Sequence, residues 1–169
     1  MEAKKFRQLN EALDWVFEAP KKDQVARLKT IASKNQTVVP LTRWGVGAEK
    51  VDWGLPEGLP ESAKIKDDIP EGMGETTLTL EFRRIKAFTD PNSNMKNLPD
   101  WKQEMNWLSI MEGVHHKEAE FMTAVKDVKL LNLYPKLEAI LPDLGITDYV
   151  KPKKTRKKAV KKSEKKYWK

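Results

Sequence analysis

A lysine-rich C-terminal segment limits how much of this chain can contribute to a folded core. Residues 151–169 contain ten Lys, one Arg and a single acidic residue, Glu164. Like charges at this density repel one another, and the segment offers almost no apolar surface to bury. We therefore expect one compact domain over residues 1–149 and a disordered cationic tail over residues 150–169.

The net positive charge of the chain comes from this tail. The whole chain has a formal net charge of +7, whereas residues 1–150 carry 21 basic and 24 acidic side chains. The body is therefore slightly acidic, and a cationic extension of this kind indicates a partner that is a polyanion.

The composition also excludes several classes of site. The chain contains no Cys, which rules out disulfides, thiolate zinc sites and a cysteine nucleophile. No apolar run approaches the length of a membrane span, and the first residues lack the apolar core of a secretory signal. We expect a soluble cytoplasmic protein without a membrane partner; the pattern says nothing about oligomeric state.

Apolar residues at spacings of three and four predict helices at both ends of the body. The first covers residues 6–19 and ends at Pro20, and the second covers residues 21–34. Later helices are predicted over residues 99–113 and 115–127, with short helical pieces over residues 130–144. The inward face of the third helix is marked by Leu98, Trp101, Met105, Leu108 and either Met111 or Glu112.

The sequence pattern in the middle of the body predicts a small antiparallel sheet. Leu78, Leu80 and Phe82 alternate with polar residues, which is typical of a strand with one buried face. Its expected partner is the segment "TVVPL" at residues 37–41, where Pro40 favours an edge position. The predicted fold class is therefore α+β: a mostly helical single domain with a small antiparallel sheet and a disordered basic tail.

Two tryptophans lie in a segment rich in Gly and Pro between residues 42 and 61. Large aromatic side chains are usually buried, so Trp44 and Trp53 are expected to anchor this loop on the core. The alternative is that Trp44 and Trp53 are exposed and contact a partner.

Several motifs resemble a known family. They are "LDWVFEAPKKDQVARL", "WGVGAEKVDWGLPEGLPE" and the stretch from "LEFRRI" to "DPNSNMKNLPDWKQEMNWLSIMEGVHHKEAEFMTAVKDVKLLNLYP". The chain from about residue 9 to residue 150 resembles a family of small uncharacterised proteins of tailed myovirus phages of the T-even type. The resemblance implies a phage-encoded protein acting in the cytoplasm of an infected bacterial host. It implies no catalytic or binding residue.

Both histidines lie in "EGVHHKEAE". Glu112 and His115 have the spacing of a ligand pair in di-metal carboxylate proteins. Such a site needs a second pair, and the chain contains only two His. We therefore expect polar residues at a helix junction, with no metal and no cofactor. Phosphate-loop, dinucleotide and nucleophile-elbow signatures are also absent, so we expect no enzyme.

Basic residues also lie in "EFRRIKAF". Arg83, Arg84 and Lys86 could bind phosphate, with Phe82 stacking on a base. On a strand, however, Arg83 points away from the other two, which favours a solvated or ion-paired strand instead.

The tail gives the strongest functional signal. It can neutralise phosphates and release counterions without reading base sequence. Tyr167 and Trp168 can stack on unpaired bases. The expected nucleic-acid-binding residues are Lys153, Lys154, Arg156, Lys157, Lys158, Lys161, Lys162, Lys165, Lys166, Tyr167 and Trp168. An acidic protein groove, an anionic lipid surface and a purely solubilising tail are the alternatives.

These observations lead to two hypotheses about function. The first is a non-enzymatic phage accessory protein whose tail binds nucleic acid non-specifically while its body docks to another protein. The second is an interaction or assembly protein that acts on a host or phage machine, with the tail serving only electrostatic steering.

Overall fold

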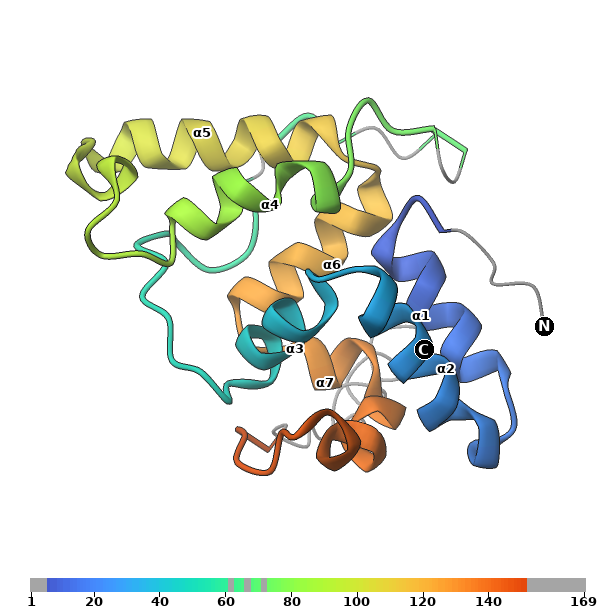
Figure 1. Cartoon of the computed structure of the whole chain (residues 1–169). Helices are drawn as coiled ribbons and strands as arrows, with labels where there is room; N and C mark the ends of the chain where they lie inside the picture. Colours follow the sequence, from blue (N-terminus) through green and yellow to red (C-terminus); the bar gives the residue numbers. More distant parts are fainter. Residues whose placement is uncertain (1–5, 61–62, 66–67, 71–72, 152–169) are drawn as a thin grey trace, which may run out of the picture.

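The computed structural model describes residues 6–60, 63–65, 68–70 and 73–151, and this part of the chain is mostly helical. The predicted tail beyond Lys151 lies outside the described residues. The elements, coloured along the chain in Figure 1, are α1 (Leu9–Glu18), α2 (Lys21–Lys34), α3 (Val38–Val46), α4 (Leu78–Ala87), the 3-10 helix η1 (Asn94–Asn97), α5 (Asp100–Gly113), α6 (His116–Lys126), α7 (Leu130–Leu133) and the 3-10 helix η2 (Pro135–Leu144).

Helix α6 lies at the centre of the arrangement. It packs against α1, α3, α5 and α7 (Figure 1). Its buried apolar residues, Ala119, Phe121, Met122 and Val125, occur at spacings that cover more than one side of the helix. A helix that is buried on several sides needs this wide apolar surface.

The predicted antiparallel sheet is wrong, because both of its expected strands are helices. Within the described residues the only β feature is an isolated parallel bridge between Thr76 and Val114. The Oγ1 atom of Thr77 accepts a hydrogen bond from the Leu80 amide at 3.3 Å and caps α4. The segment that was expected to form a strand is therefore a helix with Thr77 as its N-cap residue.

The alternation at residues 78–82 was misleading because two of its three apolar residues also fit a helical period. Leu78 and Ile85, seven residues apart, are fully buried, and Phe82 is partly buried between them on the same side. Leu80 is 72% exposed, whereas a strand would have buried it. The helical period thus describes the buried side of α4 better than the period of two.

The "TVVPL" segment forms the first turn of α3. Pro40 lies in this first turn, where the missing N–H would have no partner within the helix in any case. Leu41 and Trp44 are buried three residues apart, and Gly47 ends the helix with φ +78°. Pro40, which fits an edge strand in the sequence, therefore lies at the start of a helix.

The helices predicted at both ends of the body are confirmed by α1, α2, α5 and α6. The predicted inward face of α5 is wrong in part, because Trp101 and Met105 are 58% and 60% exposed. The buried stripe contains Gln103, Trp107, Ile110 and Met111. Gln103 concealed this stripe in the sequence, because its buried amide donates to the Leu98 carbonyl oxygen at 2.9 Å.

A close contact between α3 and α7 depends on Gly45. A Cβ atom at this position would lie 2.7 Å from Leu130 Cδ2 and 2.8 Å from Leu130 Cβ. Gly is therefore needed here for the approach of the two helices, although it lowers the intrinsic stability of α3.

We expect Gly45→Ala to lower the free energy of unfolding by about 1–3 kcal/mol, because α3 must move away from Leu130. Urea unfolding of Gly45→Ala, Leu130→Ala and the double variant measures this. The double variant should lose somewhat less than the sum of the single losses, because Leu130→Ala removes Cδ2 and Cγ and leaves only the Leu130 Cβ contact at 2.8 Å. A Gly45→Ala protein as stable as the natural chain would contradict the contact.

Candidate functional site beneath the long loop

The backbone of the chain between α3 and α4 is bonded to the body at several points, in addition to the packing of loop side chains such as Trp53 on the core. Side chains outside this loop bind its main-chain atoms along its course: Lys96 Nζ to Asp52 O (2.7 Å), Lys126 Nζ to Pro56 O (2.7 Å), Asp127 Oδ2 to Gly58 N (2.9 Å), Glu112 Oε1 to Lys64 N (3.0 Å), His115 Nε2 to Ile69 O (2.7 Å) and Arg7 Nη2 to Gly74 O (3.2 Å). An ion pair between Lys129 and Glu57 adds a contact from a loop side chain.

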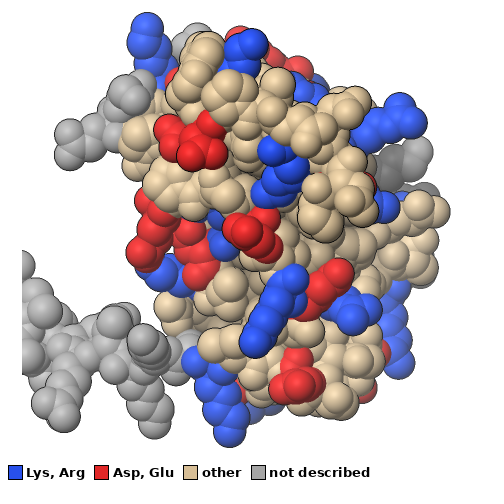
Figure 2. Space-filling model, turned by 90° about the vertical axis from the view of Figure 1, so that its left-hand side faces the viewer, with Lys and Arg blue, Asp and Glu red and all other residues tan. Residues whose placement is uncertain are grey.

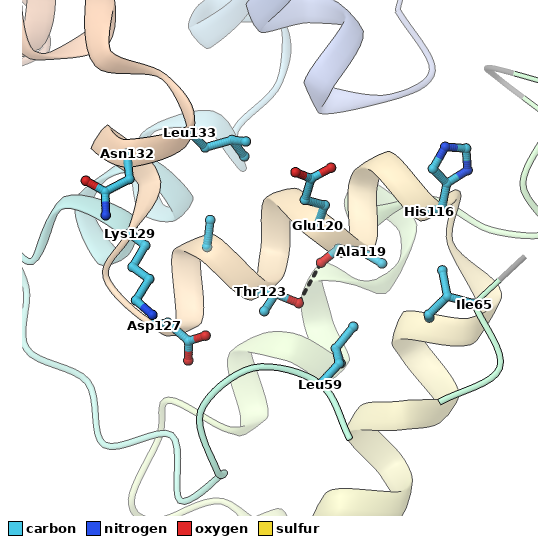
Figure 3. Close-up of a pocket in the computed structure, with 11 residues that line it drawn as sticks. Leu59, Ile65, His116, Ala119, Glu120, Thr123, Asp127, Lys129, Asn132 and Leu133 are labelled. Atoms are coloured by element: carbon cyan, nitrogen blue, oxygen red, sulfur yellow. Dashed lines mark hydrogen bonds between the residues drawn. The ribbon is translucent and has the colours of Figure 1, made fainter. Parts of the chain in front are cut away.

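A pocket of about 600 Å³ lies between this loop, α6 and α7 (Figure 3). Its apolar residues are Leu59 and Ile65 of the loop, Ala119 and Ala124 of α6, and Leu133 of α7. Its polar residues are His116, Glu120, Thr123, Asp127, Lys129 and Asn132. A concave, largely apolar pocket with a few polar groups has the usual form of a ligand site.

Three of these polar side chains are already engaged by the protein. The Thr123 hydroxyl donates to the Ala119 carbonyl oxygen at 2.7 Å, as the dashed line in Figure 3 shows. The Asp127 carboxylate accepts from the Gly58 amide and from Lys126 Nζ at 2.5 Å. Lys129 pairs with Glu57. These groups hold the loop and α6 in place.

The adjacent histidines at the start of α6 have different surroundings. His115 is 1% exposed, its Nδ1 accepts from the Lys117 amide at 3.2 Å, and its Nε2 faces the Ile69 carbonyl oxygen. These two bonds fix one tautomer, in which Nε2 carries the proton. The His116 ring lies 4.1 Å from the His115 ring, and within the described part of the chain its buried Nδ1 has no hydrogen-bond partner.

The arrangement can bind a small polar ligand but shows no nucleophile with its base. His116 and Glu120 lie four residues apart on one side of α6 and offer an imidazole and a carboxylate, with the Asn132 amide across the pocket (Figure 3). The one hydroxyl, on Thr123, is bonded to a carbonyl oxygen. A covalent mechanism needs a nucleophile in contact with an oriented base, which these residues do not provide.

Glu112 and His115, which have the spacing of a metal-ligand pair, each bind the backbone of the loop. Glu112 binds the Lys64 amide and His115 binds the Ile69 carbonyl, so both side chains attach the loop. No group of three or more metal-ligating side chains occurs among the residues that the structure describes.

Trp44 and Trp53, which were predicted to be anchors with a partner contact as the alternative, lie in the core with 5% and 6% of their surface exposed. Their rings meet edge to face with centroids 5.6 Å apart, and Trp53 also contacts Trp107 at 5.6 Å. Trp44 is stacked on Phe82 at 5.8 Å. Both tryptophans are therefore buried as expected, and Trp53 connects the loop to the core.

The predicted nucleic-acid-binding residues from Lys153 to Trp168 lie outside the described residues. The structure does show where the segment leaves the body. The Val150 amide donates to the Val46 carbonyl oxygen at 2.8 Å, at the end of α3. The chain therefore reaches Lys151 from a fixed point on the surface.

Charges on the described surface are mixed. On the face in Figure 2, basic and acidic side chains alternate without forming one large patch. Arg83, Arg84 and Lys86 are exposed on α4 rather than on a strand, and Arg84 pairs with Glu81 at 2.9 Å. No helix in the described ranges has both the length and the apolar character needed to cross a membrane.

Comparison with protein families, with curated proteins and with solved structures found no match. The site must therefore be interpreted from its own geometry.

Sequence reasoning missed the residues that hold the loop, of which Lys126 and Asp127 are the most central. Lys126 is 5% exposed and binds both Asp127 and the Pro56 carbonyl. A side chain that binds a distant backbone atom leaves no periodic pattern or spacing in the sequence. Only the position of Lys126 among apolar residues near the end of α6 gave a weak signal.

Proposed function

We propose that this protein is a non-enzymatic accessory protein that holds nucleic acid through its lysine-rich C-terminal residues while its helical body docks to another protein. The separation of charge carries the proposal. Eleven basic side chains and one acidic side chain lie in residues 151–169, against 21 basic and 24 acidic ones in residues 1–150. Phosphates attract such a segment by charge and counterion release, without base contacts. From the resemblance to phage proteins we further propose that it acts in the cytoplasm of an infected bacterium.

Two structural observations support this division of roles. The backbone bond between Val150 and Val46 ties the start of the cationic segment to the body, so a bound polyanion would stay close to the body. Trp101 and Met105, which lie four residues apart on α5, are more than half exposed. Large exposed apolar side chains on one helix are typical of a protein contact.

Salt dependence tests the first role. We expect the full chain to bind a generic 30-base-pair duplex and a 30-nucleotide single strand with affinities that fall steeply between 50 and 200 mM salt. The slope of log K against log salt should be about −0.9 per neutralised phosphate for the duplex and about −0.7 for the single strand. Fluorescence anisotropy measures both.

Two variants serve as controls. A chain that ends at Lys151 should lose the binding, and a full-length chain with Gln at every Lys and Arg from residue 153 onward should lose it equally. If the Gln variant binds as the natural chain does, charge is not the cause. If the natural chain shows no salt-sensitive binding at all, the nucleic-acid role is wrong and electrostatic steering of a protein assembly becomes the better explanation.

A further inference from the structure

A second and larger concavity lies where several helix ends meet. This groove of about 990 Å³ lies between the start of α1, the end of α2 and the starts of α3 and α4. It is separate from the pocket beneath the loop, since the two share no lining residue.

Polar contacts, two of them buried, hold the walls of the groove together. The Glu118 carboxylate of α6 accepts from the Leu9 amide at 3.2 Å and from the Leu78 amide at 3.3 Å, which are the first residues of α1 and α4. Asn35 Nδ2, just after α2, donates to Thr79 Oγ1 at 2.9 Å. The groove is therefore largely formed before a ligand arrives, which reduces the cost of binding.

The charge of the groove has one sign. Arg7 and Lys34 line it, and none of its described lining residues is acidic. The start of α1 and the end of α2 come together because these helices form an antiparallel hairpin, so both cations lie at the same end. Arg83 is exposed on α4, one turn beyond Thr79 and Leu80. A ligand for this groove should be an anion.

The remaining lining residues favour a peptide over a lipid. Phe6, Ile31 and Leu80 offer apolar surface, and Leu80 is 72% exposed at the edge of α4. The groove also contains six neutral polar side chains: Gln8, Asn35, Gln36, Thr37, Thr77 and Thr79. Asn35, Thr37, Thr77 and Thr79 are already bonded within the protein, and Gln36 is exposed. A largely polar wall of this kind attracts an acyl chain poorly, whereas a peptide backbone supplies donors and acceptors along its whole length.

We propose that this groove binds an acidic segment of a partner protein, with carboxylates beside Arg7 and Lys34 and an apolar side chain against Leu80. The inference rests on the docking role in the proposed function, because it assigns that role to a surface. It is argued from described residues of the body alone and does not use the charge of the cationic tail.

Selection from a library of random 12-residue peptides displayed on a carrier tests this proposal. The protein used is the full-length variant with Gln at every Lys and Arg from residue 153 onward, so that the tail cannot capture acidic peptides by charge. We expect enrichment of peptides that combine several Asp or Glu residues with a large apolar residue. In the full chain, Lys34→Glu and Leu80→Asp should each weaken the selected peptides by about 10-fold or more.

Matched variants separate the groove from general charge. The Lys21→Glu variant changes a charge at the other end of α2, and the Val128→Asp variant replaces an exposed apolar residue that does not line the groove. Both should leave peptide affinity unchanged. Equal loss in the groove variants and in these controls would overturn the proposal, as would the absence of enrichment. Binding of dodecanoate that depends on Lys34, with no peptide enriched, would replace the peptide with a lipid.

The same variants distinguish this inference from the proposed function. Lys34→Glu and Leu80→Asp should leave salt-sensitive DNA binding unchanged. Failure of the peptide test with DNA binding intact would reject the groove alone, and the opposite result would reject the nucleic-acid role alone.

Discussion

A Trp53→Ala protein is expected to unfold with a free energy about 3–5 kcal/mol lower than that of the natural chain. Trp53 is 6% exposed and has edge-on contacts with Trp44 and Trp107. The truncation removes a large buried surface and leaves a cavity among rigid rings. It also removes the one large aromatic anchor by which the loop enters the core. Urea unfolding followed by circular dichroism measures the loss.

Trp101→Ala is the matched control, because Trp101 is 58% exposed and contacts the Lys102 ammonium rather than the core. We expect a change within about 0.5 kcal/mol. Limited proteolysis gives a second readout, since Trp53→Ala should expose the loop at residues 52–74 to cleavage before global unfolding. A small stability loss with an uncleaved loop would show that Trp53 is not an anchor.

The second large effect concerns the pH dependence of stability through Glu118. Its side chain is fully buried, and this burial raises the pKa of Glu118 from an ordinary 4.5 to about 7, although the amides of Leu9 and Leu78 act to lower it. Glu11 raises the pKa further, and Arg7 lowers it. The folded protein therefore holds the Glu118 proton more tightly than the unfolded chain does.

The sign of the effect follows from this difference. Stability from Glu118 is fully present below about pH 4.5 and is lost as the pH rises through about 7. We expect the free energy of unfolding to fall by about 3 kcal/mol over this range because of this group. Glu118→Gln cannot ionise and should lack that decline, so its stability relative to the natural chain should improve from pH 4.5 to pH 8.

Urea unfolding at several pH values tests this expectation. Glu120→Gln removes an exposed carboxylate from the same helix and should retain the decline of the natural chain. Parallel curves for Glu118→Gln and the natural chain would show that Glu118 does not titrate in this range. Glu118→Ala should be destabilised at every pH, because the amides of Leu9 and Leu78 both lose their acceptor.

The terminal helices could be predicted because each has an apolar stripe of a single period. The structure of the middle of the chain could not be predicted in this way. Residues 78–82 satisfy a period of two and a helical period at once, and only the burial of Ile85 and the exposure of Leu80 distinguish them. Pro40 fits both an edge strand and the first turn of a helix. On α5, the buried Gln103 interrupted the true inward stripe, so the exposed side containing Trp101 and Met105 was chosen instead.

The sites were still less accessible to sequence reasoning. The pocket beneath the loop combines the loop, α6 and α7, and the groove combines four helix ends. Neither set of residues is contiguous or regularly spaced. The cationic tail was recognisable because its signal is composition alone, which needs no knowledge of how distant segments meet.

The way in which the long loop is attached has a consequence for protein engineering. Helix side chains such as Lys126, His115 and Glu112 grip its peptide groups, and peptide groups are the same whichever amino acid carries them. The path of the loop is thus encoded partly outside the loop. Loop side chains that neither pack on the core, as Trp53, Leu55 and Ile65 do, nor pair with the body, as Glu57 does, can be exchanged to build new recognition surfaces. The backbone contacts are kept by residues that need not be altered.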